Sequence, residues 1–250
     1  MKARLALAAL LVLLTGCAQD AGYAGHSVHL DGDNDYGQVG RVEAGAPLAL
    51  AGTPFTVAAW FLQEPGGDPY QRIVDKSDGM FGHDGWALSA DSETGQVHLY
   101  AHDGRKGGDF VSSRHAYTTG HWHHVVGVAR ADRHEIWIDG RLDKGATYED
   151  GGHALPAAVA TELRLGTWNH AQGREWKGRL GEVAVWRRDL GPEEIEALAR
   201  AKGRFDLRQA RGPYHGAADL VGDWCPDADT ERTGILRDLS SSRADAKIVR

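Results

Sequence analysis

The stretch WHHVVGVARADRHEIWIDG, residues 122–140, decides the fold class. Its two runs rich in β-branched and aromatic residues, 122–130 and 135–139, flank a short polar loop. Asp139 and Gly140 then supply a tight turn, since Asp-Gly is a favoured pair in such turns. The pattern therefore predicts two antiparallel strands.

Similar segments recur on both sides of this hairpin, separated by Gly, Asp and Pro. FTVAAWFL, residues 55–62, is apolar on both faces, as a central strand of a two-layer sandwich must be. A helix is expected after Gly191, because Pro192 suits the first helical position and two glutamates follow at the positive end of the helix dipole. Further strands are expected at 28–30, 72–75, 86–90, 96–102, 162–166 and 179–187. The sequence thus predicts an all-β, two-sheet antiparallel sandwich with one short helix on its C-terminal side.

The composition agrees with many tight turns and with aromatic packing. Gly accounts for 33 of 250 residues, about twice the usual share, and there are eight Trp. The sequence contains no repeat of 20–50 residues, and its length is compatible with one large β domain.

The N-terminus has the pattern of an export signal. Lys2 and Arg4 precede an unbroken apolar run, 5–14, which small residues and Cys17 follow. Ten residues of helix would span about 15 Å, too short for a hydrocarbon core of roughly 30 Å. Two cleavage patterns fit the residues: one directly before Cys17, and an ordinary signal peptide cleaved near Ala21.

The ending Leu14-Thr15-Gly16-Cys17 resembles the bacterial lipobox, in which the Cys is diacylated and becomes the first mature residue. The resemblance implies a signal peptide at 1–16, and a lipidated Cys17 with a tether at 17–25. The bilayer would then be a partner through the acylated cysteine. Ala18 in place of Asp implies sorting to the outer membrane of a bacterial cell envelope.

Loss of the signal changes the charge and the cysteine count. Without Lys2 and Arg4, 26 basic residues face 35 acidic ones, a net charge of −9. An acidic chain with no basic block is poorly suited to phosphate backbones, which excludes nucleic acid as an expected partner. If Cys17 is lipidated, Cys225 has no intramolecular partner, and no disulfide framework is expected.

Four segments, taken together and in order, resemble the laminin-G-like, concanavalin-A-like jelly roll of many bacterial surface proteins. They are SVHLDGDNDYGQV (27–39), FTVAAWF (55–61), WHHVVGVARADRHEIWIDGRL (122–142) and GRLGEVAVWRRDLGPEEIEAL (178–198). The match spans roughly residues 27–200, and it implies a jelly-roll sandwich.

The segment 220–249 resembles the part that usually opens such a domain, although here it comes last. About thirty residues cannot build a core of their own. We therefore expect residues 219–249 to return to the sandwich and complete a sheet, which gives a single domain over 26–249. The alternative is a frayed tail.

The turn after residue 30 carries the pattern of a calcium site. Asp31, Asp33 and Asp35 crowd oxygen ligands into one turn, and Ca²⁺ takes six to eight such ligands. The resemblance implies one structural Ca²⁺ held between this turn and Glu182 on the closing strand, although Gly181 stands where the family commonly has Asp. The alternative is a solvated, Asx-rich turn.

Other candidate chemistry is weaker. His123 and His124 point to opposite faces of one strand, so packed or hydrogen-bonded histidines are expected there rather than a metal site. Laminarinase-type relatives carry a Glu-x-Asp-x-x-Glu strand, and this sequence contains none. A glycoside hydrolase, which needs two converging carboxylates, therefore remains only a minority hypothesis.

Exposed aromatic residues beside polar loops are what a sugar-binding protein requires. Alternation places Trp86 and Tyr100 in the expected core, whereas Trp168 and Trp176 flank a polar loop that begins at Asn169. We expect these last three residues to form a ligand-binding edge. The sequence therefore favours a non-catalytic envelope binding module for a glycan or a surface protein. The alternative is a structural or adhesive lipoprotein without a small ligand.

Replacement of Cys17 by Ala tests the anchor. Without the thiol no acyl chain can be attached, and several chains are needed for stable anchoring. We expect the variant to be found unprocessed or released when membrane and soluble fractions are compared by immunoblot. A correctly cleaved, unacylated chain that remains fully membrane-bound would contradict the prediction.

Overall fold

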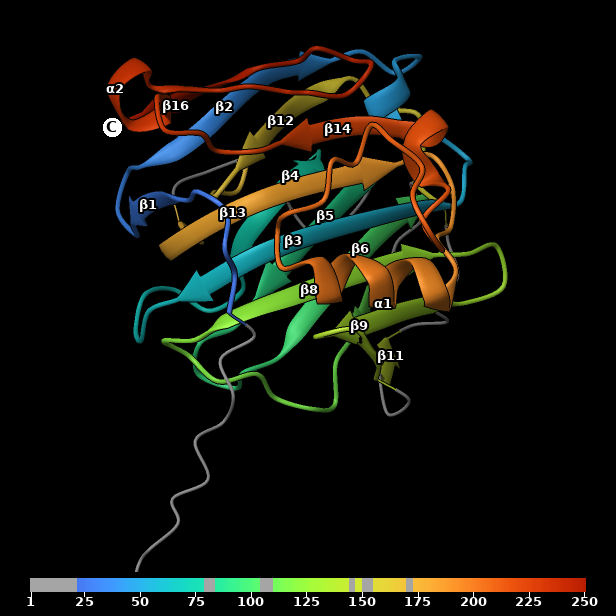
Figure 1. Cartoon of the computed structure of the whole chain (residues 1–250), viewed down its shortest axis with the longest axis horizontal. Helices are drawn as coiled ribbons and strands as arrows, with labels where there is room; N and C mark the ends of the chain where they lie inside the picture. Colours follow the sequence, from blue (N-terminus) through green and yellow to red (C-terminus); the bar gives the residue numbers. More distant parts are fainter. Residues whose placement is uncertain (1–21, 79–83, 104–109, 144–146, 150–154, 170–172) are drawn as a thin grey trace, which may run out of the picture.

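The computed structural model describes residues 22–78, 84–103, 110–143, 147–149, 155–169 and 173–250. In these residues two antiparallel sheets stack face to face, and a short helix lies against one of them (Figure 1). The predicted all-β sandwich with one short helix near residue 192 is confirmed. Cys17 and the lipobox lie outside the described residues.

The first sheet contains seven strands within the described residues, in the order β1-β13-β3-β8-β9-β10, and β14 also pairs with β13. Its strands are β1 (Val28–Asp31), β3 (Phe55–Gln63), β8 (Trp122–Ala129), β9 (His134–Ile138), β10 (Arg141–Leu142), β13 (Lys177–Trp186) and β14 (Leu220–Trp224). The hairpin predicted at 122–140 forms as β8 and β9, with Val126 opposite Trp137.

The second sheet has nine strands in the same described ranges, in the order β11-β7-β6-β5-β4-β12-β2-β16-β15. They are β2 (Tyr36–Val42), β4 (Gln71–Ser77), β5 (Asp84–Ala90), β6 (Val97–Asp103), β7 (Phe110–Ser112), β11 (Thr147–Glu149), β12 (Thr161–Leu165), β15 (Ile235–Leu236) and β16 (Ala246–Val249). In the centre of this sheet β4 lies between β5 and β12.

The helix α1 (Pro192–Ala201) begins as its sequence predicts. Pro192 takes the first helical position, and the Glu194 carboxylate accepts the Gly191 backbone N–H at 2.9 Å. Two short 3₁₀ turns, Pro47–Ala49 and Gly216–Asp219, and α2 (Thr230–Thr233) complete the helical part of the described chain. Among the described residues, no helix has the length and apolar character required to cross a membrane.

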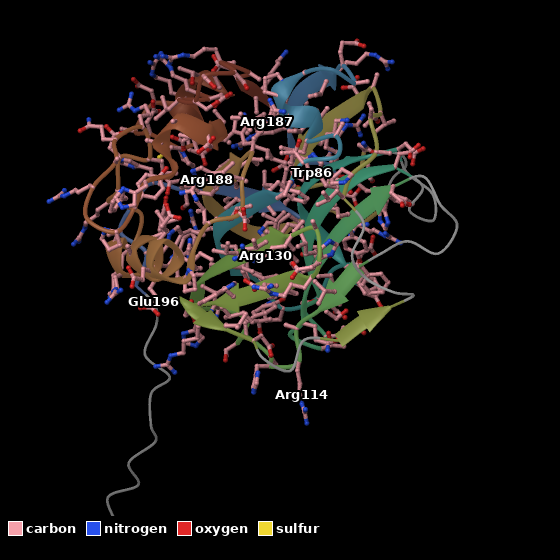
Figure 2. All side chains as sticks on the ribbon, turned by 90° about the vertical axis from the view of Figure 1, so that its right-hand side faces the viewer. Trp86, Arg114, Arg130, Arg187, Arg188 and Glu196 are labelled. Atoms are coloured by element: carbon pink, nitrogen blue, oxygen red, sulfur yellow. The ribbon has the colours of Figure 1, made fainter. Side chains whose placement is uncertain are left out.

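The main core lies between the two sheets. Alternate residues of β3 face it, including Phe55, Val57 and Phe61. Trp86 of β5 faces it from the other sheet; it is fully buried, and its indole N–H donates to the Leu48 carbonyl at 3.1 Å (labelled in Figure 2). Trp86 was expected in the core, and it lies there.

A second apolar layer covers the opposite face of the seven-stranded sheet. Ala58 of β3, Val126 of β8 and Trp186 of β13 pack against Ile195 and Leu198 of α1. In Figure 1 the helix crosses in front of β3 and β8. The seven-stranded sheet is therefore buried on both faces, which is why the 55–62 strand is apolar on both of its sides.

The C-terminal tail adds strands to both sheets, whereas the sequence led us to expect only one. β14 pairs with β13, and β16 pairs with β2 (Figure 1). Trp224, at the end of β14, is fully buried, and its indole N–H donates to the Ala244 carbonyl at 2.8 Å. Residues 219–249 thus hold the edges of the two layers together.

Tyr23 fills a gap at the edge of β13. β1 pairs with residues 177–180 of this strand and β14 with residues 183–186, on the side opposite β3. Between them, the Glu182 backbone N–H donates to the Tyr23 hydroxyl at 3.1 Å. The Tyr23 ring packs on Trp60, with 5.3 Å between ring centroids, and a Cβ at Gly203 would overlap the ring.

Two carboxyl groups lie under this tyrosine. Asp223 of β14 is buried, and its Oδ1 has no hydrogen-bond partner in the described chain. Burial and the nearby Asp238 raise the pKa of Asp223 to about 7. Burial and Asp223 likewise raise the pKa of Glu182 well above its ordinary value. The folded state therefore holds these protons more tightly than the unfolded chain does.

Asp223→Asn should remove part of the pH dependence of stability. Folding raises the pKa of Asp223, so the protonated carboxyl group stabilises the folded state fully below about pH 4. This contribution to the unfolding free energy is lost as the pH rises through about 7. We expect the variant to gain about 2 kcal/mol of unfolding free energy at pH 8 and little at pH 4. Urea titrations between pH 4 and pH 8 measure the unfolding free energy, and Asp132→Asn, at an exposed position, is the matched control. Parallel pH profiles in wild type and both variants would contradict the prediction.

Candidate functional site

The outward face of the nine-stranded sheet carries the candidate site. Along β6, Leu99 and Ala101 face the core, so His98 and Tyr100 face outward. Their partners on β5 across the sheet are Ser89 and Ala87. Polar and aromatic side chains thus gather on this face, over the centre of the sheet.

An ion pair lies in the middle of this face. Arg72 Nε is 2.9 Å from Asp75 Oδ2, and both side chains are buried. The Arg72 guanidinium lies 4.5 Å from the centre of the Tyr100 ring, which stacks on Phe110. Burial alone would lower the pKa of Arg72, but Tyr100 and Asp75 outweigh it and raise this pKa.

Several buried polar atoms around this pair have no hydrogen-bond partner in the described chain. They are Arg72 Nη1, Ser89 Oγ, His98 Nε2 and Arg164 Nε. His98 Nδ1 does lie 2.7 Å from Ser112 Oγ. Because buried polar groups are normally paired, these atoms mark a polar, incompletely satisfied layer beneath this face.

Two loops form the rim of this face. Tyr70 ends the β3–β4 loop, and Arg174 lies in the β12–β13 loop. Both adopt left-handed backbone conformations, with φ of 57° and 63°. The Arg72 backbone N–H donates to the Arg174 carbonyl at 3.0 Å, and the Arg174 backbone N–H donates to Asp68 Oδ2 at 2.9 Å. Such conformations are unfavourable for residues other than Gly, and they gather at functional sites.

Arg174 is held by aromatic rings. Its guanidinium carbon lies 4.3 Å from the Trp168 ring centre and 5.9 Å from that of Tyr70. Tyr70 is 39% exposed and is the only large hydrophobic residue of the described chain that is classed as exposed. Burial and the charge of Arg72 lower the pKa of Arg174. The rim therefore offers accessible ring surface around a cation.

The structure separates the three residues that the sequence placed on a ligand edge. Trp168 lies on the rim, beside Arg174. The Asn169 amide nitrogen donates to the Glu162 carbonyl at 2.9 Å and to that of Ser77, so it fixes the loop. Trp176 does not lie on an edge: it is fully buried, because it packs edge-on against Phe61 in the core.

Tyr100 was expected in the core, and this was wrong. Trp86 and Leu99 take the inward positions, so Tyr100 lies half-buried on the outward face. Sequence analysis also missed Tyr70, Arg72 and Arg174. One signal was available for Tyr70: an aromatic residue at the end of the polar, Gly- and Pro-rich loop PGGDPY (65–70).

The proposed calcium ligands do not form one site. Asp31 is opposite Lys177 on β13, and Glu182 lies five residues further along that strand, about 17 Å away at 3.3 Å per residue. Asp31 Oδ1 accepts the Asp33 backbone N–H at 2.9 Å, as in an Asx turn. No group of three or more potential metal ligands of the His, Cys, Asp or Glu type occurs in the described part of the chain.

Comparison with protein families identifies the family to which the chain belongs. Residues 31–196 match the laminin-G family described as the concanavalin A-like lectin/glucanases superfamily. The chain belongs to this family. A search among curated proteins finds no match.

Solved structures with the same fold include domains described as carbohydrate-binding. A candidate carbohydrate-binding protein from Bacteroides ovatus has a TM-score of 0.58 at 15% identity, over 87% of this chain and 58% of that one. The CBM40 of Ruminococcus gnavus IT-sialidase has a TM-score of 0.55 at 14% identity, over 70% of this chain and 96% of that one. Domain 4 of AbnA, an arabinanase from Geobacillus stearothermophilus, has a TM-score of 0.50 at 17% identity, over 71% of this chain and 80% of that one. At these identities the likeness establishes the fold.

Calcium binding by the turn at residues 31–35, without Glu182, stays a prediction. If Asp31, Asp33 and Asp35 bind Ca²⁺, a hundredfold excess over Kd should add about 2.7 kcal/mol of stability and raise Tm by several degrees. Asp33→Ala should abolish this rise, whereas Glu182→Gln, on a distant part of β13, should leave it unchanged. Differential scanning calorimetry in Ca²⁺ and in chelator measures the shift. Equal Tm values would leave the turn as a solvated one.

Proposed function

We propose that this protein is a non-catalytic glycan-binding module whose site is the outward face of the nine-stranded sheet. The arrangement at the rim supports the proposal: the Tyr70 and Trp168 rings flank Arg174, and Tyr70 also packs on His98, with 5.0 Å between ring centroids. A sugar presents apolar C–H faces, which stack on aromatic rings, and hydroxyls, which need directional polar groups. This face supplies both.

The related structures support the choice of ligand class. The three compared above are described as binding carbohydrate or as binding domains of carbohydrate-active enzymes, and one CBM40 structure contains α2,3-sialyllactose. Fold does not by itself determine function. For this chain, its own rim residues therefore carry the proposal.

Its carboxylates support a binding role rather than hydrolysis. Glycoside hydrolysis requires an acid and a second carboxylate facing one cleft. On the candidate face, Asp75 is paired with Arg72. The buried pair Glu182 and Asp223 lies on the other sheet, where Tyr23 hydrogen-bonds the Glu182 backbone. We therefore assign the face to binding, and assays for released sugar would test the minority hypothesis of a hydrolase.

An acylated Cys17 would place the module on the cell surface. The proposed anchor lies only six residues before Tyr23, which contacts the sandwich. Six extended residues reach about 20 Å. The lipid would thus hold the module close to the outer membrane, as a receptor for glycans in its surroundings.

Tyr70→Ala tests the proposed site. A glycan array identifies a ligand, and titration calorimetry then measures its Kd. We expect about a tenfold increase in Kd, because a stacked ring contributes about 1.4 kcal/mol. The control is Glu196→Ala on α1, against the opposite sheet (labelled in Figure 2). Equal effects of the two changes would place the site elsewhere. If the folded protein binds no glycan, the structural or adhesive alternative is favoured.

A further inference from the structure

In the part of the chain that the structure describes, the Arg174 guanidinium has no direct salt-bridge partner, and Asp75, the carboxylate whose charge acts on it, is already paired with Arg72. None of the side-chain N–H groups of Arg174 donates a hydrogen bond within the same described residues. We propose that Arg174 binds the carboxylate of an acidic sugar. This inference rests on the proposed glycan-binding function and specifies the ligand class of that same site.

Two other half-buried arginines, both near the seven-stranded sheet, form ion pairs, whereas Arg164 does not. Arg130 bonds Glu135 and Asp189, and Arg188 bonds Glu194 and lies 3.2 Å from Asp219 (both arginines labelled in Figure 2). The fold thus supplies carboxylates to arginines that it places near the surface of the seven-stranded sheet. At Arg174 it supplies aromatic rings instead.

The acidic residues nearest in sequence to the Arg174 loop are already occupied. Asp68 Oδ2 accepts the Arg174 backbone N–H at 2.9 Å, and Glu175 Oε1 accepts that of Gly173 at 2.8 Å. Both carboxylates therefore hold the backbone of the loop in place. Neither carboxylate forms a salt bridge with the Arg174 side chain, so its N–H groups are left for a partner from outside the chain.

The stacking of Arg174 suits a planar anion. Contact with the Trp168 and Tyr70 rings restrains the guanidinium and reduces the entropy that it loses on binding. Its N–H groups point along the edge of the guanidinium plane, where a carboxylate can accept two of them in parallel. The same rings offer apolar surface to the sugar that carries the carboxylate.

The surrounding charges add to this preference. Arg164 stacks on Tyr36 at 5.1 Å, and it forms no ion pair among the described residues. Arg72, the charge that most lowers the pKa of Arg174, also lies on this face. Because Asp75 is paired with Arg72, the arginines of this face that lack a direct ion pair within the described chain are Arg164 and Arg174. These two charges favour an anionic sugar over a neutral one.

Matched ligand pairs test the inference. Calorimetry compares trigalacturonic acid with its methyl ester, and sialyllactose with lactose, while sulfated lactose serves as a non-carboxylate anion. The proteins are the wild type, Arg174→Gln, Arg174→Lys and the surface control Arg200→Gln, each checked for an unchanged Tm. We expect the wild type to bind at least one acid about tenfold more tightly than its neutral partner.

The variants separate the outcomes. Arg174→Gln should abolish the acid preference, Arg174→Lys should restore only part of it, and Arg200→Gln should leave both the acid preference and neutral binding unchanged. Equal binding of acid and neutral partners would overturn the inference but leave glycan binding intact. A preference for sulfate over carboxylate would also overturn it. The absence of binding to any glycan would overturn the proposed function itself.

Discussion

The burial of the seven-stranded sheet on both of its faces is the constraint on which the rest of the structure depends. The second sheet covers one face and α1 covers the other, so β3 and β13 are apolar on both sides. The outward face of the nine-stranded sheet instead carries polar and aromatic side chains. There, period-two alternation turns His98 and Tyr100 away from the core.

The pairing of β4 with β12 assembles the candidate site from distant parts of the sequence. Arg164 of β12 lies opposite Asp75 of β4. The loop that enters β4 carries Tyr70, and the loop that leaves β12 carries Trp168 and Arg174. A backbone hydrogen bond from Arg72 to Arg174 joins the two segments, about a hundred residues apart. The rim is thus built on a rigid sheet, which favours preorganised binding.

Two opposite solutions to buried charge occur in this molecule. On the candidate face, the buried carboxylate of Asp75 is paired with Arg72, whereas Asp223 is buried beside other acids and keeps its proton to about pH 7. In the first arrangement each buried charge is compensated by the other. The second stores an electrostatic penalty next to Tyr23, where the N-terminal segment meets the sandwich.

The sequence by itself determined most of the longer strands, the helix α1 and the two-layer architecture, because alternation and turn residues are local signals. It also correctly placed Trp86 in the core. Only the tertiary structure decided that Trp176 is buried, that Tyr100 faces outward and that Glu182 lies far from the Asp31 turn. It alone brought Tyr70 and Arg174 together. The physical reason is that alternation fixes which residues share a face but not which face is buried, and that cross-strand register sets distances between segments far apart in the chain.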